Sequence, residues 1–414
     1  MLPDHHKRID CRLCSSPNLE RVLSLTPTPP ANALVPASDV HKAQTSYPLD
    51  VYRCSDCGHL QLLDIVDPRI LFTHYVYVSS TSPVMVNYLK GQSVAIAHRL
   101  RLKSGDLVVE IGSNDGTLLR FFKAMGVRVL GVDPAENIIP DQHEIDTIND
   151  FFDAEVGQRI REKYGEAKLV CAYNVCAHID NLRGVIGGVR ALLAEDGQFV
   201  FEVGYLLDVY RKTLFDTIYH EHLDFHHVEP LVRFFEENGL RLVHVEQSDI
   251  QGGALVGYVA GPSTRVEPTV AALIAMEREA GLDRPDTFRR WGLQIAQRGE
   301  ELMALLRGLK DKGHTIAAYG ATAKATTLMY HFGLDSTLLD YIVDDNPIKQ
   351  GLYTPGLHIP ILSPAVIYER RPDYIVILAW NFAASIIDKH RHYAGHSSRF
   401  IVPLPNLSLV GVES

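Results

Sequence analysis

The sequence predicts an α/β protein built from two doubly wound, Rossmann-like domains, preceded by a small zinc-binding domain at the N-terminus. Three observations predict this architecture. Four of the six cysteines occur as two Cys-x-x-Cys pairs near the start of the chain. A strand, a glycine turn and a helix follow in order from Leu107. The same order returns from Thr315, so the two halves resemble a structural duplication.

Length and composition limit the possible classes of protein. The 414 residues exceed a typical domain of about 100–200 residues, so several folding units are expected. The content of 46% hydrophobic and 22% charged residues is typical of globular proteins. The start has no apolar leader and no run of about 18 apolar residues follows, so we expect a cytoplasmic protein. The net charge of −10 disfavours nucleic-acid binding, and we expect a monomer.

The paired cysteines predict a structural metal site. Cys11-x-x-Cys14 and Cys54-x-x-Cys57 can supply the tetrahedral set of four thiolates that zinc prefers. Disulfides are disfavoured in a reducing cytoplasm. A catalytic zinc needs an open coordination position, which four cysteines do not leave. Several prolines between the two pairs predict an irregular loop there.

A nucleoside-binding region is predicted from Leu107 to Asp133. A buried-strand run at 107–111 leads into the turn Gly112-Ser-Asn-Asp-Gly116 and then into a helix-like stretch. Gly112 and Gly116 let the backbone approach a ligand closely, and the start of the helix offers free amides. The next strand ends in Asp133, whose carboxylate can accept hydrogen bonds from both hydroxyls of a ribose.

Other polar candidates stand near the carboxyl ends of the predicted strands, where sheets of this kind bind ligands. They are Glu110, Asn114, Asn174 and His178. The pattern Glu110-x-Gly112-x-x-x-Gly116 resembles the class I S-adenosylmethionine methyltransferases and differs from the GxGxxG dinucleotide fingerprint. A methyl donor is therefore favoured over a nicotinamide cofactor. A glycine turn required only for tight packing is the other alternative.

The densest polar cluster is Tyr219-His-Glu-His222, followed closely by His226 and His227. A histidine near neutrality, oriented by Glu or Tyr, can remove a proton that a neighbouring ketone has made acidic. A metal site is one alternative. However, His220 and His222 would point to opposite faces of a strand, and no HExxH helix spacing is present. Solvated surface histidines are another alternative.

The region after Pro262 begins with two predicted helices, at 267–281 and 286–312, which form a helical connector. A strand, a single-glycine turn and a helix then follow from Thr315, and a strand at 341–346 ends in acidic residues. Lysines beside such a turn can hold a diphosphate. The substrate-binding candidates here are Tyr319, Lys324, Asn346 and Lys349. The alternative is an ordinary strand–helix–strand unit with surface lysines.

Over nearly its whole length, the chain resembles the sugar C-methyltransferases of deoxysugar biosynthesis. The resemblance depends on separate motifs that occur in one order. They are the two Cys-x-x-Cys pairs, Tyr75-x-Tyr77-x-Ser-Ser80, Glu110-Ile-Gly-Ser-Asn-Asp-Gly116-Thr-Leu-Leu119, Tyr219-His-Glu-His222 and Tyr319-Gly-Ala-Thr-Ala-Lys324.

This resemblance implies the use of S-adenosylmethionine and a structural zinc ion. It also implies methylation at C3 of a nucleoside-diphosphate 4-keto-6-deoxysugar. The implied division is a zinc-binding domain at 1–70, a methyltransferase domain at 71–260, the helical connector at 261–312 and a Rossmann-like nucleotide-sugar-binding domain at 313–414.

Residue roles are also implied by the matching motifs. His222 resembles the base that removes the C3 proton, and Glu221 and Tyr219 would orient this base or bind the sugar and its enolate. Tyr75 or Tyr77 is expected to approach the sugar. Ser80 and His178 complete the expected substrate-binding set.

Four alternative functions remain. They are C5 methylation of a similar keto-sugar, O-methylation of a small hydroxylated metabolite, nucleotide binding without turnover by a zinc-ribbon protein, and RNA methylation. The acidic balance disfavours RNA methylation. The Tyr219–His222 cluster argues against a non-catalytic protein.

Overall fold

The computed structural model describes residues 4–73, 75, 77–138, 144–391 and 399–411. The chain forms two compact units, and each is made from three separate stretches. The first unit contains Met1–Glu20, Tyr52–Leu207 and Leu223–Asp283. The second unit contains Arg21–Val51, Asp208–His222 and Arg284–Ser414. The consecutive four-part division of the sequence analysis stays a prediction.

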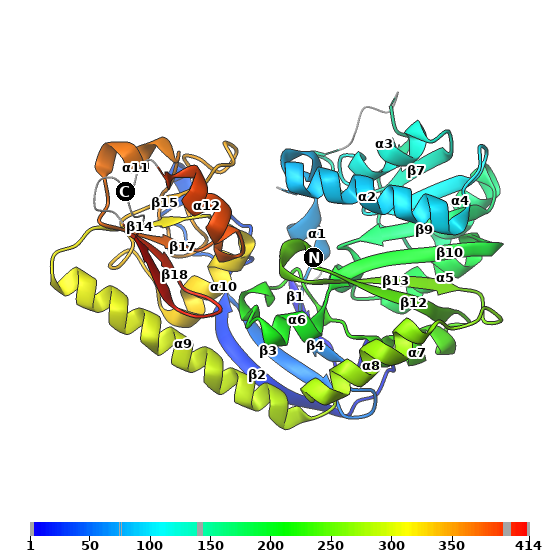
Figure 1. The fold of residues 1–414 in the computed structure, drawn as a ribbon, viewed down its shortest axis with the longest axis horizontal. Helices are drawn as coiled ribbons and strands as arrows, with labels where there is room; N and C mark the ends of the chain where they lie inside the picture. The colour runs from blue at the N-terminus through cyan, green and yellow to red at the C-terminus, as the bar shows by residue number, and fades with distance from the viewer. Residues whose placement is uncertain (1–3, 74, 76, 139–143, 392–398, 412–414) are drawn as a thin grey trace. The chain divides into compact units, whose positions relative to one another are not determined.

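The first unit is organised around a seven-stranded sheet with the order β12-β13-β10-β9-β6-β7-β8 (Figure 1). Its strands are β6 Leu107–Ile111, β7 Arg128–Val132, β8 Thr147–Ile148, β9 Ala167–Tyr173, β10 Leu193–Gly204, β12 Arg241–Ser248 and β13 Ala254–Ala260. Strand β13 runs antiparallel to both of its neighbours, whereas β6 to β10 run parallel. All five residues of β6 are buried, as expected for a parallel strand that is covered on both faces.

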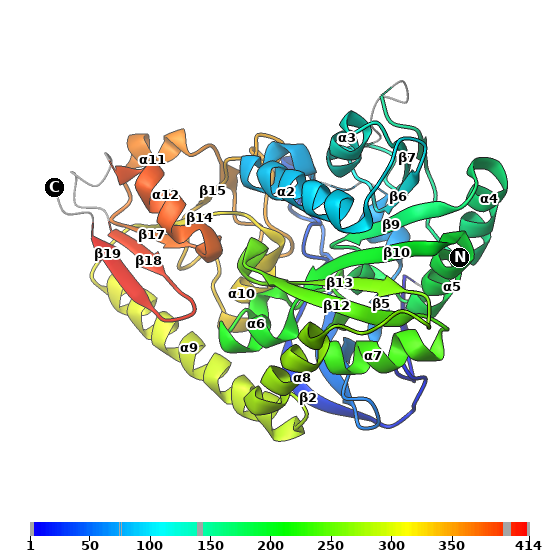
Figure 2. The ribbon, with the colours of Figure 1, turned by 45° about the vertical axis from the view of Figure 1, so that its right-hand side comes forward.

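Helices cover both faces of this sheet. The helices of the first unit include α1 Pro68–Phe72, α2 Pro83–Leu100, α3 Thr117–Ala124, α4 Ala154–Tyr164, α5 Leu182–Leu192, α7 Val228–Glu237 and α8 Pro268–Ala280. Figures 1 and 2 show α2 and α3 on one face and α5 and α7 on the other. Leu89 and Ile96 of α2 and Leu118 of α3 pack in one buried cluster with Val108 of the sheet. This packing fixes the turn between β6 and α3.

The N-terminal strands are short, apart from two. They are β1 His5–Lys7, β2 Leu19–Thr28, β3 Tyr47–Cys54, β4 Leu60–Leu62 and β5 Asp64–Val66, with β11 Asp224–Phe225 added later in the chain. Four of them form a sheet in the order β11-β4-β3-β2. The loop prediction between the cysteine pairs is partly wrong, since β2 includes Pro27. An edge strand tolerates proline because one row of its amides needs no strand partner.

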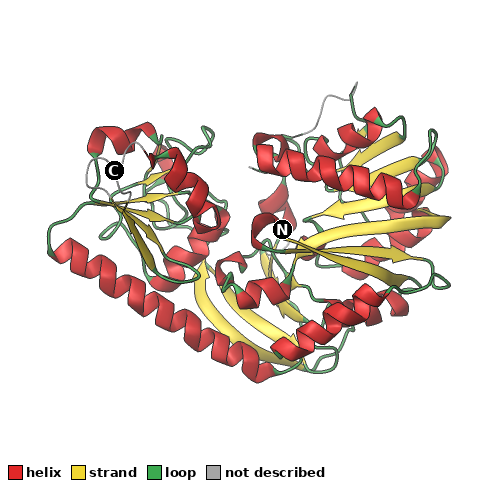
Figure 3. Ribbon diagram, in the orientation of Figure 1, coloured by secondary structure: helices red, strands yellow, loops and turns green. Residues whose placement is uncertain are grey.

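The second unit contains a six-stranded sheet in the order β16-β15-β14-β17-β18-β19. Figure 3 shows the strands of this unit in yellow, with helices in red around them. Its strands are β14 Ile316–Tyr319, β15 Ile342–Val343, β16 Ile361–Leu362, β17 Tyr374–Ile377, β18 Arg399–Val402 and β19 Ser408–Gly411. Only the pairing of β18 with β19 is antiparallel among these described strands. The predicted α/β class with two doubly wound sheets is therefore confirmed.

The remaining helices include the second of the two helices predicted after Pro262. They are α6 Leu206–Arg211, α9 Pro285–Asp311, α10 Ala323–Phe332, α11 Ala365–Arg370 and α12 Ala383–Lys389. The two connector helices predicted at 267–281 and 286–312 match α8 and α9. A Cβ added to Gly299 of α9 would lie 2.6 Å from the Phe332 ring of α10, so glycine permits this close packing. Among the described helices, none is long and apolar enough to cross a membrane.

Candidate functional site

The turn between β6 and α3 requires its glycines. Gly112 and Gly116 have φ angles of +68° and +76°, in the left-handed region that favours glycine. A Cβ on Gly112 would also lie 2.3 Å from Cγ2 of Val175. The amide of Asn114, inside the turn, donates to Oδ2 of Asp133 at 2.7 Å. The turn and the predicted ribose-binding carboxylate are therefore held together.

Asp133 is fixed by backbone amides. Its Oδ1 accepts a hydrogen bond from the amide of Ala135 at 2.9 Å, in addition to the bond from Asn114 to Oδ2. Burial raises the pKa of Asp133, and these two hydrogen bonds oppose the shift. Each oxygen keeps a second lone pair, so a fixed carboxylate remains able to accept hydroxyl donors.

Glu110 lies at the end of β6 with a buried side chain. Its Oε2 has no hydrogen-bond partner among the residues that the structure describes. Burial raises the pKa of Glu110 well above its ordinary value, and the nearby carboxylates of Asp133 and Asp115 raise it further. This orphaned oxygen is suited to a ligand that brings its own donor or positive charge.

Two asparagine side chains hold the predicted tyrosine segment against this region. Asn114 accepts from the amide of Ser79 at 2.9 Å and donates to the carbonyl oxygen of Tyr77 at 3.0 Å. Asn137 accepts from the amide of Tyr75 at 2.9 Å and donates to its carbonyl oxygen at 2.8 Å. Each asparagine thus pairs with the backbone as a neighbouring strand would. Asn137 was missed, because only the folded chain brings it to Tyr75.

Two further predicted residues lie in the same unit. The amide of Ser80 donates to Oδ2 of Asp115 at 3.1 Å. The ring of His178 stacks on Phe72 with centroids 5.5 Å apart, and Phe72 also contacts Tyr75 at 5.8 Å between centroids. The folded chain therefore brings Ser80 to the glycine turn and brings His178 and Tyr75 to the same side chain, Phe72, although they come from separate stretches of sequence.

Glu202, at the carboxyl end of β10, was missed by the sequence analysis. Asn174 follows β9 and donates through Nδ2 to Oε1 of Glu202 at 2.9 Å, and the hydroxyl of Tyr88 donates to Oε2. Asn174 has a φ of 56°, and its amide donates to the carbonyl oxygen of Glu202 at 2.9 Å. Burial raises the pKa of Glu202 to about 7, although both side-chain hydrogen bonds lower it. The sequence does contain a signal for this site, because Glu202 is the lone acidic residue at the end of a buried strand.

The four predicted cysteine ligands come together. Their sulfur atoms all lie within 4.8 Å of one another. Sγ of Cys11 lies 3.6 Å from Sγ of Cys57, and Sγ of Cys14 lies 3.5 Å from Sγ of Cys54. A zinc tetrahedron with bonds of about 2.3 Å needs sulfurs about 3.8 Å apart, so the four thiols fit zinc. Across the described ranges, no other group of three or more His, Cys, Asp or Glu side chains could hold a metal.

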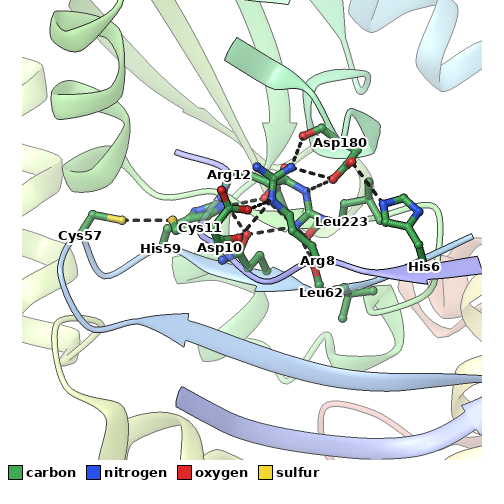
Figure 4. Close-up of polar contacts among 12 residues, drawn as sticks. His6, Arg8, Asp10, Cys11, Arg12, Cys57, His59, Leu62, Asp180 and Leu223 are labelled. Carbon is green, nitrogen blue, oxygen red and sulfur yellow. Dashed lines mark hydrogen bonds and ion pairs between the residues drawn. The ribbon is translucent and has the colours of Figure 1, made fainter. Parts of the chain in front are cut away.

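Arg12 lies between the first two cysteines and links the zinc site to Leu62 and Leu223 by hydrogen bonds (Figure 4). Its side chain is buried, and Nη1 donates to the carbonyl oxygens of Leu62 at 2.6 Å and Leu223 at 3.4 Å. Gln61 Oε1 accepts from both the amide and Nη1 of Arg12 at 3.1 Å. Leu223 is the residue that follows His222.

Two carboxylates balance this guanidinium. Arg12 Nη1 lies 3.7 Å from Oδ1 of Asp224, and Arg12 Nε donates to Oδ1 of Asp180 at 3.1 Å. His59 Nε2 lies 2.6 Å from the same oxygen of Asp224. Burial alone would raise the pKa of Asp224, but Arg12 and His59 outweigh it and lower the pKa. The ionised carboxylate is therefore already satisfied by the protein.

The Tyr219–His222 cluster lies in the second unit, on a turn and not on a strand. The amide of His222 donates to the carbonyl oxygen of Tyr219 at 2.8 Å. His222 Nδ1 donates to the carbonyl oxygen of Thr217 at 2.7 Å, which leaves the lone pair on Nε2. The hydroxyl of Tyr219 lies 3.0 Å from this Nε2. Burial lowers the pKa of His222 to about 4, so the ring is neutral at physiological pH.

The other members of the cluster have different surroundings. Glu221 Oε1 accepts from Asn32 Nδ2 at 2.7 Å, and burial raises the pKa of Glu221 to about 7. The surface-histidine alternative is wrong for His220, His226 and His227, which are 0%, 1% and 3% exposed. The metal alternative for the histidines finds no support among the described side chains.

The two candidate lysines differ in their contacts. Lys324, in the first turn of α10, lies near Asp216 and His222. Burial raises the pKa of Asp216 to about 6, and the charge of Lys324 opposes this shift. For His222, the same charge adds to the lowering of the pKa by burial. Asp216 is buried and accepts from Nε1 of Trp380 at 2.7 Å. Lys349 instead donates to the carbonyl oxygen of Ala321 at 2.8 Å. Lys324 therefore stands beside the histidine, whereas Lys349 supports the turn after β14.

Tyr319 and Asn346 occupy the carboxyl ends of β14 and β15. The hydroxyl of Tyr319 lies 3.2 Å from Nε2 of His390. The amide of Asn346 donates to Oδ1 of Asp344 at 2.8 Å, and its side chain accepts from the amide of Ile348 at 3.0 Å. Asn346 thus contributes to a local turn that follows β15, whereas Tyr319 makes a long-range contact with His390.

Solved structures with a partial likeness include two methyltransferases. The glycopeptide N-methyltransferase MtfA complexed with S-adenosylmethionine gives a TM-score of 0.33 at 11% identity, covering 42% of this chain and 94% of that chain. The magnesium protoporphyrin IX methyltransferase ChlM from Synechocystis PCC 6803 with bound SAM gives a TM-score of 0.31 at 14% identity, covering 42% of this chain and 78% of that one.

Three family models match successive parts of the chain. The model described as "Putative zinc binding domain" matches residues 11–72. A methyltransferase domain matches residues 88–245, and a C-methyltransferase C-terminal domain matches residues 249–405. The matched order agrees with the order of motifs in the sequence.

One curated relative matches almost end to end. The C-methyltransferase NovU of Streptomyces niveus is 37% identical over 409 residues, which are 98% of this chain and 97% of the relative. The resemblance to the sugar C-methyltransferases is thereby confirmed, as are S-adenosylmethionine and zinc as cofactors. The chain belongs to the C-methyltransferase family and is an S-adenosylmethionine-dependent enzyme.

Proposed function

We propose that the enzyme methylates C3 of a nucleoside-diphosphate-linked 4-keto-6-deoxysugar by way of an enolate, with His222 as the base. The observation that carries this proposal is the arrangement of His222. Its Nδ1 is held by the carbonyl oxygen of Thr217, and its Nε2 faces the hydroxyl of Tyr219 at 3.0 Å. A neutral imidazole with a fixed tautomer is prepared to accept a proton at one defined atom.

The chemistry of the substrate explains why such a base is needed. A C4 ketone acidifies the hydrogen on C3, and removal of this proton to Nε2 of His222 leaves an enolate. The developing negative charge stabilises the imidazolium, whose Nδ1–H is already bonded to Thr217. S-adenosylmethionine supplies the methyl group as an electrophilic sulfonium. Alignment of the two reactants then contributes much of the rate.

Neighbouring groups in the second unit have supporting roles in this proposal. Tyr219 holds the ring of His222 before the substrate binds, and its hydroxyl can then donate to the enolate oxygen. Glu221, held by Asn32, binds a sugar hydroxyl. Lys324 places a positive charge near His222, where it also favours the enolate. The remaining residues proposed for the nucleotide-sugar are Tyr319, Asn346 and Lys349.

The donor is assigned to the first unit. Asp133 binds the ribose, and the glycine turn passes beside the methionine part of the donor. Residues proposed to hold the donor are Glu110, Gly112, Asn114, Gly116, Asp133 and Asn174. Tyr75, Tyr77, Ser80 and His178 complete the substrate side, and the four domains at 1–70, 71–260, 261–312 and 313–414 belong to the same proposal.

The test is to incubate a panel of nucleoside-diphosphate 4-keto-6-deoxysugars with the enzyme and S-adenosylmethionine, followed by mass spectrometry and NMR of each product. We expect one sugar of the panel to gain one methyl group on C3. A methyl group on C5 or on oxygen would contradict the assigned position. Donor binding without any methyl gain would favour a binding protein over an enzyme of this substrate class.

A further inference from the structure

Glu202 is a buried carboxylate without a cationic partner. Its side chain is 0% exposed, and the hydrogen-bond donors to its carboxylate are Nδ2 of Asn174 and the hydroxyl of Tyr88, which are both neutral. Among the residues that the structure describes, no lysine, arginine or histidine forms an ion pair with it. The phenols of Tyr77 and Tyr173 also lie close enough for the charge of Glu202 to raise their pKa values, in addition to the effect of burial.

Such an arrangement is costly in the empty protein. Two neutral donors satisfy hydrogen-bonding capacity, but they do not neutralise a buried charge. The carboxyl group either takes up a proton or receives a cation that is not part of the chain. Burial raises its pKa toward neutrality, which is the first of these responses. A ligand carrying a positive charge would provide the second.

The place of Glu202 in the sheet indicates which ligand brings that charge. Glu202 of β10 pairs with Tyr173 of β9, and Cys171 of β9 pairs with Glu110 of β6, which leads into the glycine turn. Val175, two residues after β9, packs against Gly112 of that turn. Glu202 therefore ends at the same carboxyl edge of the sheet as the turn assigned to the methyl donor.

We propose that Glu202 determines how strongly the donor site prefers S-adenosylmethionine over S-adenosylhomocysteine. This inference rests on the proposed location of the donor. When the methyl group leaves, the electrons of the broken S–C bond stay on sulfur, so the sulfonium cation becomes a neutral thioether. A carboxylate near the sulfur therefore loses its attraction at the moment of transfer. Tyr88 and Asn174 act as positioning residues that hold the carboxylate.

The experiment is isothermal titration calorimetry of the full chain with S-adenosylmethionine and, separately, with S-adenosylhomocysteine. Glu202→Gln keeps the size of the side chain and removes its charge. We expect its dissociation constant for the cationic donor to rise roughly tenfold, while that for the neutral product changes by less than about twofold. Tyr88→Phe removes one hydrogen bond but keeps the charge, so both dissociation constants should shift by similar factors.

Equal shifts for both ligands in Glu202→Gln, or no shift for either, would overturn the proposal, because a purely structural role moves both alike. If Glu202→Gln does not fold, Glu202→Asp keeps the charge and should retain the wild-type ratio of the two dissociation constants. A changed ratio in that variant would also overturn it. Failure of the wild-type chain to bind either ligand is a different result and would contradict the proposed donor site itself.

Discussion

Two buried carboxylates in the first unit have opposite electrostatic surroundings. Asp224 lies 3.7 Å from the guanidinium of Arg12 and 2.6 Å from the ring of His59. These partners overcome the effect of burial and lower its pKa. Glu202 is equally buried but receives only neutral donors, and burial raises its pKa to about 7.

The difference separates a structural carboxylate from one prepared for a ligand. Asp224 has its counter-charges built into the chain, so its ionised form stabilises the junction between the zinc site and the strand after His222. Among the described residues, Glu202 has no such counter-charge, and its ionised form is stabilised only by the neutral donors of Tyr88 and Asn174. A bound cation would supply the missing charge.

Loss of zinc should have the largest effect, because it removes the centre that holds Arg12 in place. Zinc binding in small four-ligand sites contributes on the order of 10 kcal/mol to folding. We expect Cys54→Ser to lose the metal and to lose hydrogen-exchange protection around β3 and β4, with β10 less affected. Metal analysis and exchange mass spectrometry measure both changes. Uniform loss of protection in β4 and β10 would contradict a local role.

Arg12→Met should destabilise the protein by about 3–5 kcal/mol, because it leaves buried Asp224 without its guanidinium partner. Arg8→Met is the matched control, since Arg8 also pairs with Asp180, at 3.0 Å, but on the surface side of the network. We expect this control to cost about 1 kcal/mol or less. Urea denaturation of both variants measures the difference. Equal losses would contradict the special role of Arg12.

Glu202→Gln should stabilise the ligand-free protein at high pH. The folded-state pKa of Glu202 is raised to about 7 from the ordinary 4.5, so the folded state holds this proton more tightly than the unfolded state. The destabilising effect is therefore complete above about pH 7 and disappears as the pH falls toward 4.5. The variant should gain at most about 3 kcal/mol at pH 8 and nothing near pH 4.5.

The wild-type protein is the control for the stability of Glu202→Gln. Other buried carboxyl groups with raised pKa values, such as Glu221 and Glu277, are present in both proteins, so their effects cancel in the difference. Urea denaturation of the two ligand-free proteins at both pH values gives the result. A stability difference that does not depend on pH would mean that the charge of Glu202 is already compensated.

Asp133→Asn should have the smallest effect, and it should change the affinities for the two ligands in a different way from Glu202→Gln. The ribose is common to S-adenosylmethionine and S-adenosylhomocysteine, so this change should weaken both by a similar factor of roughly ten. Calorimetry with the two ligands measures this pattern against that of Glu202→Gln. A normal affinity for both ligands would contradict the ribose assignment.

Sequence patterns were sufficient where a residue type is demanded by local structure. The strand Leu107–Ile111 was predicted with its observed ends, because a buried apolar run is bounded by Gly112. The zinc site followed from cysteine spacing alone. In both cases the information lies within a few neighbouring residues.

The parts that were missed depend on contacts between distant stretches. The role of Glu202 depends on its hydrogen bonds with Tyr88 and Asn174. The role of Arg12 depends on its ion pair with Asp224, which is more than 200 residues away in the sequence. The turn at Tyr219–His222 was not predicted, because the sequence gives no sign of the hydrogen bond from His222 to Thr217 that holds it. Long-range polar partners leave no periodic trace in a single sequence.

The most direct test of the account is solvent deuterium exchange at C3 of the keto-sugar substrate, with S-adenosylhomocysteine in place of the donor. Wild-type enzyme should exchange the C3 hydrogen, and His222→Asn should reduce the rate by about 10²–10⁴-fold while binding the sugar nucleotide normally. Exchange at an unchanged rate in His222→Asn, or exchange confined to C5, would contradict His222-catalysed enolate formation at C3.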